Sequence, residues 1–176
     1  KEWRFNPKIS GGGELLDQGV HVIELLRWFG GEFESAYGVC KNQVWKANVE
    51  DNSFATLRNK RATAMFHVSA TNWGNIFSFE IFGDRGYLII EGLGRRYGVE
   101  TLKVGKRKFE FGDVARKTFV FPQKVDMSWD REWENFLGAI RWKKDILGGM
   151  EDGLAANRIA EAIYRSSAVH REVRIN

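Results

Sequence analysis

Cysteine is nearly absent from this sequence, since Cys40 is the single thiol among 176 residues. One cysteine cannot form a disulfide within the chain, which excludes a fold held together by disulfide bonds. Folding without disulfides fits a reducing compartment, and we expect a cytoplasmic protein.

Long apolar runs are absent as well. A transmembrane helix needs about 20 predominantly apolar residues, and the best candidate, residues 15–29, is interrupted by Asp17, His21 and Glu24. The chain shows no secretory signal and begins at Lys1 rather than at Met. We therefore expect no membrane partner, and we interpret the sequence as a piece of a longer protein.

A large excess of one charge is also missing, because 27 Lys and Arg against 23 Asp and Glu leave a formal net charge of +4. The basic residues at 103–108 and at Arg95-Arg96 are typical of soluble loops. Nucleic-acid binding through aromatic strands is an alternative, but no RNA-recognition signature is present, and Phe77 and Phe79 are better explained as core. We expect no nucleic-acid partner.

The apolar content is high enough for a folded core. Hydrophobic residues make up 43% of the chain and aromatic residues 14%, which excludes an intrinsically disordered chain. A length of 176 residues favours one domain with a sizeable core, and we expect that domain to span residues 1–176.

The predicted elements follow the order helix, many strands, then two helices. A loop over 1–13 precedes a helix over 14–29, and we expect Ser128 and Asp152 to cap the two closing helices. This order favours an α+β fold, a large, mostly antiparallel open sheet with helices on one face. The predicted strands span residues 34–41, 44–48, 53–58, 62–71, 77–82, 87–91, 98–103, 117–121 and 172–175.

The predicted strand over 62–71 has two unlike faces, because apolar residues alternate there with a second set of side chains. A period of two places that set on one face of the sheet, and an antiparallel sheet can leave one face open to another surface. An assembly module that self-associates through this face is one hypothesis for the function. The second set is Thr63, Met65, His67, Ser69 and Thr71.

The first predicted helix carries a polar stripe made of Asp17, His21, Glu24 and Trp28. These positions lie within about 60° of one another around a straight helix. A large indole is a poor choice for a face that meets only water. We therefore expect this face to meet another surface, either the sheet or a further domain.

Asp17 and His21 stand one helical turn apart and can form a hydrogen bond. A carboxylate orients an imidazole and favours its protonated form, and an imidazole so held can exchange a proton with a substrate hydroxyl or carbonyl group. An ordinary pair on a helix surface is the alternative. A metal site that adds Glu24 is disfavoured, because no further His or Cys has ligand-like spacing, and we expect no metal.

The run Gly11-Gly12-Gly13 precedes the same helix, whose free backbone N–H groups would attract an anion or a polar ligand. Glycine leaves room for such a close approach. The run is not a dinucleotide-binding fingerprint, because no predicted strand leads into it and the G-x-G-x-x-G spacing is absent.

Together these residues resemble a known family. The pattern Gly11-Gly12-Gly13-x-Leu15-x-Asp17-x-Gly19-x-His21, with Trp3-Arg4 upstream, is similar to the motif of the glucose–fructose oxidoreductase, inositol dehydrogenase and MocA family. The turn Gly83-Asp84-Arg85-Gly86, the Trp- and Phe-rich helix and the Ala-rich final helix agree with it. The resemblance covers essentially the whole chain.

The resemblance implies one half of an NAD(P)-dependent oxidoreductase. The family's N-terminal Rossmann domain binds NAD or NADP, and its C-terminal α/β domain contacts the substrate and often a second subunit. This chain resembles the second domain alone. The resemblance implies that His21 is the catalytic acid–base residue, with Asp17 as its catalytic partner or a substrate ligand. It also implies that Trp3 and Arg4 lie near the nicotinamide and the substrate.

One position departs from the family pattern, because many relatives have Asp three residues after the His, where this chain has Glu24. We therefore assign no role to Glu24. We expect the chain to be the substrate-binding and catalytic half of an oxidoreductase that acts on a sugar, polyol or sugar derivative by hydride transfer. Without its N-terminal domain it should be inactive. The alternative is an oligomerisation or ligand-binding module without catalysis of its own.

Overall fold

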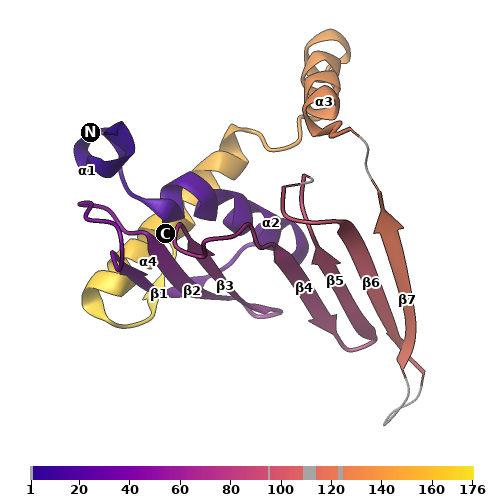
Figure 1. Cartoon of the computed structure of the whole chain (residues 1–176), viewed down its shortest axis with the longest axis horizontal. Coiled ribbons are helices and arrows are strands. Elements are labelled where there is room, and N and C mark those ends of the chain that lie inside the picture. Colours follow the sequence, from indigo (N-terminus) through magenta and orange to yellow (C-terminus); the bar gives the residue numbers. More distant parts are fainter. Residues whose placement is uncertain (1, 95, 109–113, 123–124) are drawn as a thin grey trace. The chain divides into compact units, whose positions relative to one another are not determined.

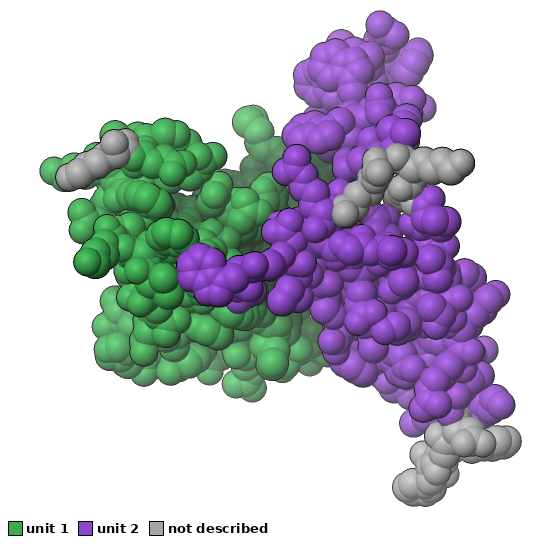
Figure 2. Space-filling view, in the orientation of Figure 1, with its two compact units in different colours: residues 1–71, 147–176 green, residues 72–146 purple. Residues whose placement is uncertain are grey.

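The computed structural model describes residues 2–94, 96–108, 114–122 and 125–176. The chain divides into two compact units: residues 1–71 with 147–176 form unit 1, and residues 72–146 form unit 2 (Figure 2). Each unit holds a four-stranded antiparallel sheet. The predicted α+β class and the antiparallel pairing are confirmed, but the described strands form two sheets rather than the one large sheet that we expected.

The sheet of unit 1 has the strand order β3-β2-β1-β8, and its first three strands are labelled in Figure 1. Cross-strand register sets Ala36 opposite Leu57 and Leu57 opposite Ala64, which gives one face an apolar row. A turn at Asn59 joins the second strand to the third, because its side-chain oxygen accepts the N–H of Ala62 at 2.7 Å. The strands are β1 (Ser35–Lys41), β2 (Asn52–Arg58), β3 (Thr63–Ser69) and β8 (Val173–Arg174).

Two helices, α2 (Val20–Gly30) and α4 (Met150–Val169), pack on that apolar face and bury the core of unit 1. Helix α4 approaches β1 closely because Gly38 has no side chain, and Ser166 of α4 accepts the N–H of Gly38 at 3.0 Å. This contact satisfies a backbone donor on the edge of β1 that the short strand β8 leaves uncovered. The largest fully buried apolar side chains are Leu15, Ile23, Leu57, Ile159 and Ile163.

The segment before α2 is more helical than predicted. The expected loop over 1–13 contains a 3-10 turn, η1 (Trp3–Phe5), and a short helix, α1 (Pro7–Ser10). The helix predicted over 14–29 is confirmed, although its first turn is π-helical, η2 (Leu15–Gly19), before it continues as α2. Gly11 ends α1 with a φ of 79°, a left-handed conformation that glycine adopts without steric cost.

The sheet of unit 2 has the strand order β4-β5-β6-β7. The predicted turn over 83–86 joins the first two of these strands and sets Gly83 opposite Gly86. Register aligns Phe79, Ile90, Leu102 and Phe119 in one cross-strand row, which makes one face apolar. The strands are β4 (Ser78–Gly83), β5 (Gly86–Glu91), β6 (Glu100–Arg107) and β7 (Val114–Phe121).

The two closing helices are confirmed, but their caps are not the predicted ones. Ser128 is the first residue of α3 (Ser128–Trp142), and Met127 occupies the N-cap position. Asp152 lies inside the first turn of α4, where its Oδ2 accepts the N–H of the N-cap residue Gly149 at 3.1 Å. Among the described residues, no helix has the length and apolar character that a membrane crossing requires.

The segment 44–48, predicted as a strand, is a loop between β1 and β2. The carboxylate of Asp51 accepts the N–H groups of Gln43, Val44 and Trp45 at 2.8–2.9 Å. Because these donors bind a side chain, they do not pair with a neighbouring strand. The strand predicted over 44–48 is therefore wrong.

Gly38→Ala should destabilise the protein, because the new methyl group would lie 2.5 Å from Cγ2 and 3.0 Å from the backbone oxygen of Ile163. We expect the free energy of unfolding to fall by about 1–3 kcal/mol, as overpacking usually costs. Gly153→Ala in α4 is the control, since nothing lies within 4 Å of its added Cβ. It should raise stability by about 0.5–1 kcal/mol. Chemical denaturation measures both, and equal effects would contradict this packing.

Candidate functional site

Unit 1 contains a cavity of about 380 Å³, which we call the Trp3–Asp17 cavity. It is lined by the N-terminal segment, by the start of η2 and by the loop between β1 and β2. Three of the four predicted site residues, Trp3, Arg4 and Asp17, line it. The other lining residues used below are Glu14, Trp45, Glu50 and Asp51.

The three predicted residues contact one another at the cavity wall. The guanidinium carbon of Arg4 lies 4.9 Å from the centre of the Trp3 ring, and its Nε lies 3.8 Å from Oδ2 of Asp17. Trp3 is 54% exposed, so much of its indole can meet a ligand. The wall thus presents an aromatic face, a guanidinium and a carboxylate, which is a suitable set for a polar organic ligand.

His21 stands apart from this group. It is an exposed residue of α2 and is not among the residues that line the Trp3–Asp17 cavity. Within the described part of the chain, the ion-pair partner of Asp17 is Arg4, and no hydrogen bond joins Asp17 to His21. The catalytic role of His21 stays a prediction that rests on the family motif.

The remaining residues of the polar stripe have separate surroundings. Glu24 accepts a hydrogen bond from Nη1 of Arg27 at 2.9 Å, and Arg27 also reaches Asp152 of α4 at 3.5 Å. Glu24 therefore belongs to an ion-pair cluster between α2 and α4. Trp28 is 73% exposed. In the residues that the structure describes, no three His, Cys, Asp or Glu side chains are grouped to hold a metal ion.

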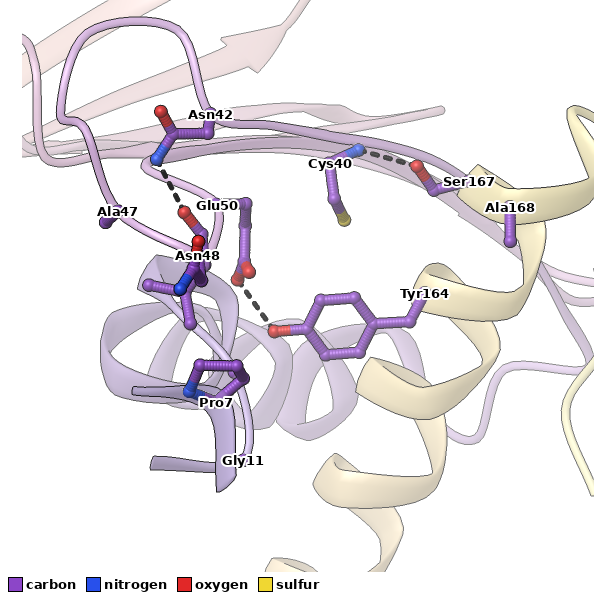
Figure 3. A pocket seen from close by; sticks show the side chains of 12 residues that line it. Pro7, Gly11, Cys40, Asn42, Ala47, Asn48, Glu50, Tyr164, Ser167 and Ala168 are labelled. Carbon is purple, nitrogen blue, oxygen red and sulfur yellow. Dashed lines mark hydrogen bonds between the residues drawn. The ribbon is translucent and has the colours of Figure 1, made fainter. Parts of the chain in front are cut away.

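The glycine-rich segment binds a carboxylate of its own chain. Glu50 accepts the N–H of Gly13 at 3.0 Å and the N–H of Leu15 at 3.1 Å, and the hydroxyl of Tyr164 donates to its Oε1 at 2.7 Å (Figure 3). A Cβ on Gly13 would collide with the backbone oxygen of Glu50, and a Cβ on Gly12 would collide with the Tyr164 hydroxyl. The backbone donors that we expected to attract a ligand are thus occupied by Glu50.

A second cavity of about 540 Å³ lies against the same carboxylate (Figure 3). Its wall includes Cys40, whose N–H donates to Oγ of Ser167 at 2.9 Å. Burial raises the pKa of the Cys40 thiol. Burial, followed by the hydrogen bond to Glu50, raises the pKa of Tyr164. Both groups are therefore neutral near pH 7.

Asp51 holds the loop that completes the Trp3–Asp17 cavity. Its side chain is buried, with 4% of the residue exposed. Burial alone would raise its pKa, but hydrogen bonds from the N–H groups of Trp45, Val44 and Gln43 and from the Asn52 amide outweigh it and lower the pKa to about 2. Asp51 is therefore ionised, and it fixes the backbone from which Trp45 reaches the cavity.

Sequence reasoning missed Glu50, Asp51, Trp45 and Tyr164. Glu50 binds Gly13 across a separation of 37 residues and Tyr164 across 114, so no local spacing links them. The one available signal is the acidic pair at the end of the loop, because buried carboxylates need N–H donors. That signal does not specify which donors they bind.

Comparison with protein-family models matches residues 1–89, just over half of the chain, to the GFO/IDH/MocA C-terminal domain. The chain belongs to this family. The resemblance of its motif to the family is thereby confirmed. A comparison with curated protein sequences gave no significant match.

Several solved structures share the fold. Levoglucosan dehydrogenase in complex with NADH and L-sorbose matches with a TM-score of 0.87 and 22% identity, over 100% of this chain and 53% of that one. An NAD-binding oxidoreductase from Klebsiella pneumoniae matches with a TM-score of 0.83 and 19% identity, over 100% of this chain and 54% of that one. The WlbA dehydrogenase from Bordetella pertussis, in complex with NADH and UDP-GlcNAcA, matches with a TM-score of 0.70 and 21% identity, over 94% of this chain and 46% of that one. The chain spans about half the length of these proteins.

Asp51→Asn should lower the free energy of unfolding by about 2 kcal/mol at pH 7, because the folded-state pKa of Asp51 is about 2 and the ordinary value is 3.8. A carboxylate whose pKa is lowered by folding stabilises the folded state at pH values above its ordinary pKa, here 3.8. This contribution disappears as the pH falls from 3.8 through about 2. The difference in the free energy of unfolding between wild type and variant should therefore shrink below pH 4, by about 2 kcal/mol in total.

Urea denaturation at a series of pH values measures this difference. Asp145→Asn, at an exposed aspartate of unit 2, is the control and should change stability little at any pH. A difference between wild type and Asp51→Asn that stays constant down to pH 2 would show that the ionised carboxylate does not hold the loop.

Proposed function

We propose that this chain is the substrate-binding and catalytic domain of an NAD(P)-dependent oxidoreductase that acts on a sugar, polyol or sugar derivative. The observation that carries the proposal is the Trp3–Asp17 cavity, which three residues of the family motif line together. Membership of the family supports the reaction class, and the NADH and sugar named for two structural neighbours support cofactor and substrate class.

The residues of this chain fit NAD or NADP as a cofactor that another domain would mainly bind. The chain has no G-x-G-x-x-G sequence, so an N-terminal Rossmann domain would hold the nucleotide. The half-exposed indole of Trp3, with Arg4 over its ring, suits the planar nicotinamide end of NAD or NADP. These two residues would therefore contact cofactor and substrate at the opening of the cavity.

The reaction moves a hydride and a proton off a CH–OH group and leaves a carbonyl group. The nicotinamide ring, when bound, supplies the hydride acceptor at its C4 atom. Arg4 and Asp17 would orient the substrate hydroxyls through charge-assisted hydrogen bonds. His21, one turn further along the same helix, would take the hydroxyl proton as general base. The isolated chain should be inactive, because the cofactor lacks its main binding site.

Joining the chain to an N-terminal NAD(P)-binding domain of the family should give hydride transfer, measured by the absorbance of the reduced nicotinamide. His21→Ala and Asp17→Asn should each lower kcat by about 10²-fold, as loss of a general base or of its orienting partner does. Glu134→Gln, on an exposed position of α3, is the control and should leave kcat unchanged.

Equal activity of His21→Ala and wild type would remove His21 from the mechanism. Failure of the joined protein to oxidise any sugar or polyol with either cofactor, while it binds NADH, would contradict the proposed function itself.

A second function is self-association with another copy of this chain through the open face of the unit 1 sheet. Register aligns Val39, Phe54 and His67 in one row and Tyr37, Thr56 and Met65 in the next. The His67 ring stacks on Phe54 at 4.0 Å, and Met65 is 82% exposed. An apolar centre is thus flanked by the polar rows that contain Arg58 and Asn52, the pattern of a protein interface.

Three of the five residues predicted for this face, Thr63, Met65 and His67, are exposed, whereas Ser69 and Thr71 are half-buried and joined by a hydrogen bond between their hydroxyl groups at 2.8 Å.

Met65→Lys should weaken self-association by at least about tenfold, because it places a charge in the apolar centre. Sedimentation equilibrium measures the effect. Met150→Lys, on the 94% exposed Met150 of α4, is the control, and a wild-type protein that stays monomeric at high concentration would contradict this function.

A further inference from the structure

The charged side chains that line the Trp3–Asp17 cavity are mainly acidic. Four carboxylates, those of Glu14, Asp17, Glu50 and Asp51, line it together with one described cation, Arg4. That cation is already engaged, because Nη1 of Arg4 donates to Glu2 at 2.9 Å and its Nε faces Asp17. The chain as a whole carries a net charge of +4, so the negative lining is a local property of this cavity.

Glu50 occupies the backbone donors of the cavity that would otherwise favour an anion. The start of a helix offers free N–H groups to a carboxylate or phosphate. Here Glu50 accepts the N–H groups of Gly13 and Leu15, and the Tyr164 hydroxyl fixes its position. An anionic ligand would therefore have to displace Glu50 or lie beside it.

The neighbouring carboxylates reinforce this repulsion. Asp51 is held ionised by its backbone donors. Burial, followed by the charges of Asp17, Glu50 and Asp51, raises the pKa of Glu14, as expected for a carboxyl group that is half-buried beside other carboxylates. A bound carboxylate or phosphate would experience the same field.

The rest of the wall suits an uncharged ring. Trp3 and Trp45 contribute half-exposed indoles, which offer apolar faces to the C–H groups of a saturated ring. The carboxylates can accept hydrogen bonds from hydroxyl groups, and Arg4 can donate them.

On this geometry we infer that the Trp3–Asp17 cavity accepts uncharged polyhydroxylated ligands and rejects their carboxylated or phosphorylated counterparts, with Glu50 as the specificity-determining residue. The inference rests on the proposed function, since it selects one substrate class for the same cavity.

The test compares binding within matched pairs of ligands, D-glucose with D-glucuronate and myo-inositol with its monophosphate. Ligand-observed NMR titrations of the protein without NAD give the affinities independently of catalysis. The uncharged member of a pair should bind at least about tenfold more tightly than the acid, because like charges repel strongly in a partly enclosed site. Added salt should narrow this ratio, and Trp3→Leu should weaken binding of the uncharged member.

Two variants assign the effect to the carboxylates. Glu50→Gln should narrow the ratio between acid and uncharged ligand several-fold, and Glu14→Gln should do the same without removing a backbone contact. Glu134→Gln on α3 makes the same charge change far along the chain and should leave the ratio unchanged. Circular dichroism shows whether each variant is folded.

The outcomes separate the two proposals. If uncharged ligands bind and the acids bind equally well or better, the inference is overturned and the proposed function stands. If folded Glu50→Gln and Glu14→Gln both keep the wild-type ratio, the carboxylates are not the cause and the inference is again overturned. If no member of either pair binds, the inference and the proposed sugar or polyol substrate are both contradicted.

Discussion

The carboxylate of Glu50 is the contact on which the arrangement of the candidate site depends. A helix begins with backbone N–H groups that have no partner inside the helix, and here the partners come from the loop between β1 and β2. By binding Gly13 and Leu15 on one side and Tyr164 of α4 on the other, Glu50 joins three separate parts of unit 1. Leaving a carboxylate in this half-buried position without donors would cost more than the contact gains.

Two neighbouring acidic residues, Glu50 and Asp51, hold different parts of the cavity wall in place. Glu50 satisfies donors at the start of the helix, whereas Asp51 satisfies donors of its own loop. In both cases a backbone N–H group donates to a carboxylate instead of to a neighbouring strand or to water. Hydrogen bonds to a carboxylate belong to the stronger class. The loop is consequently held at its start, residues 43–45, and at its end, Glu50 and Asp51. Trp45 of this loop lines the cavity together with the N-terminal segment. The predicted stability effect of Asp51 and the proposed ligand selectivity of Glu50 thus involve neighbouring residues of one loop.

Much of the fold could be predicted because it follows from local periodicity. The apolar spacing of Leu15 and Ile23 predicts the helix that buries them, and the alternation around Phe66 and Val68 predicts β3. The segment 44–48, also predicted as a strand, is a loop because its first N–H donors bind the carboxylate of Asp51. The glycine run predicts an anion site, but the anion is Glu50 of the same chain. In both cases the deciding partner is a side chain outside the pattern, and its identity follows from tertiary structure alone.

The family motif spans two different environments. Asp17 lines the cavity and faces Arg4, whereas His21, one turn later, is exposed on α2. A reaction that uses both residues must therefore place its substrate across the edge of the cavity rather than at its base. Trp28, further along the helix, belongs to the same polar stripe, and most of its indole is exposed. A domain that supplies the cofactor would have to cover this stripe, because proton transfer to an imidazole open to water gives no control over which proton it takes. Under the proposed function, the geometry of unit 1 thus leaves the pair Asp17 and His21 to be enclosed by a further domain.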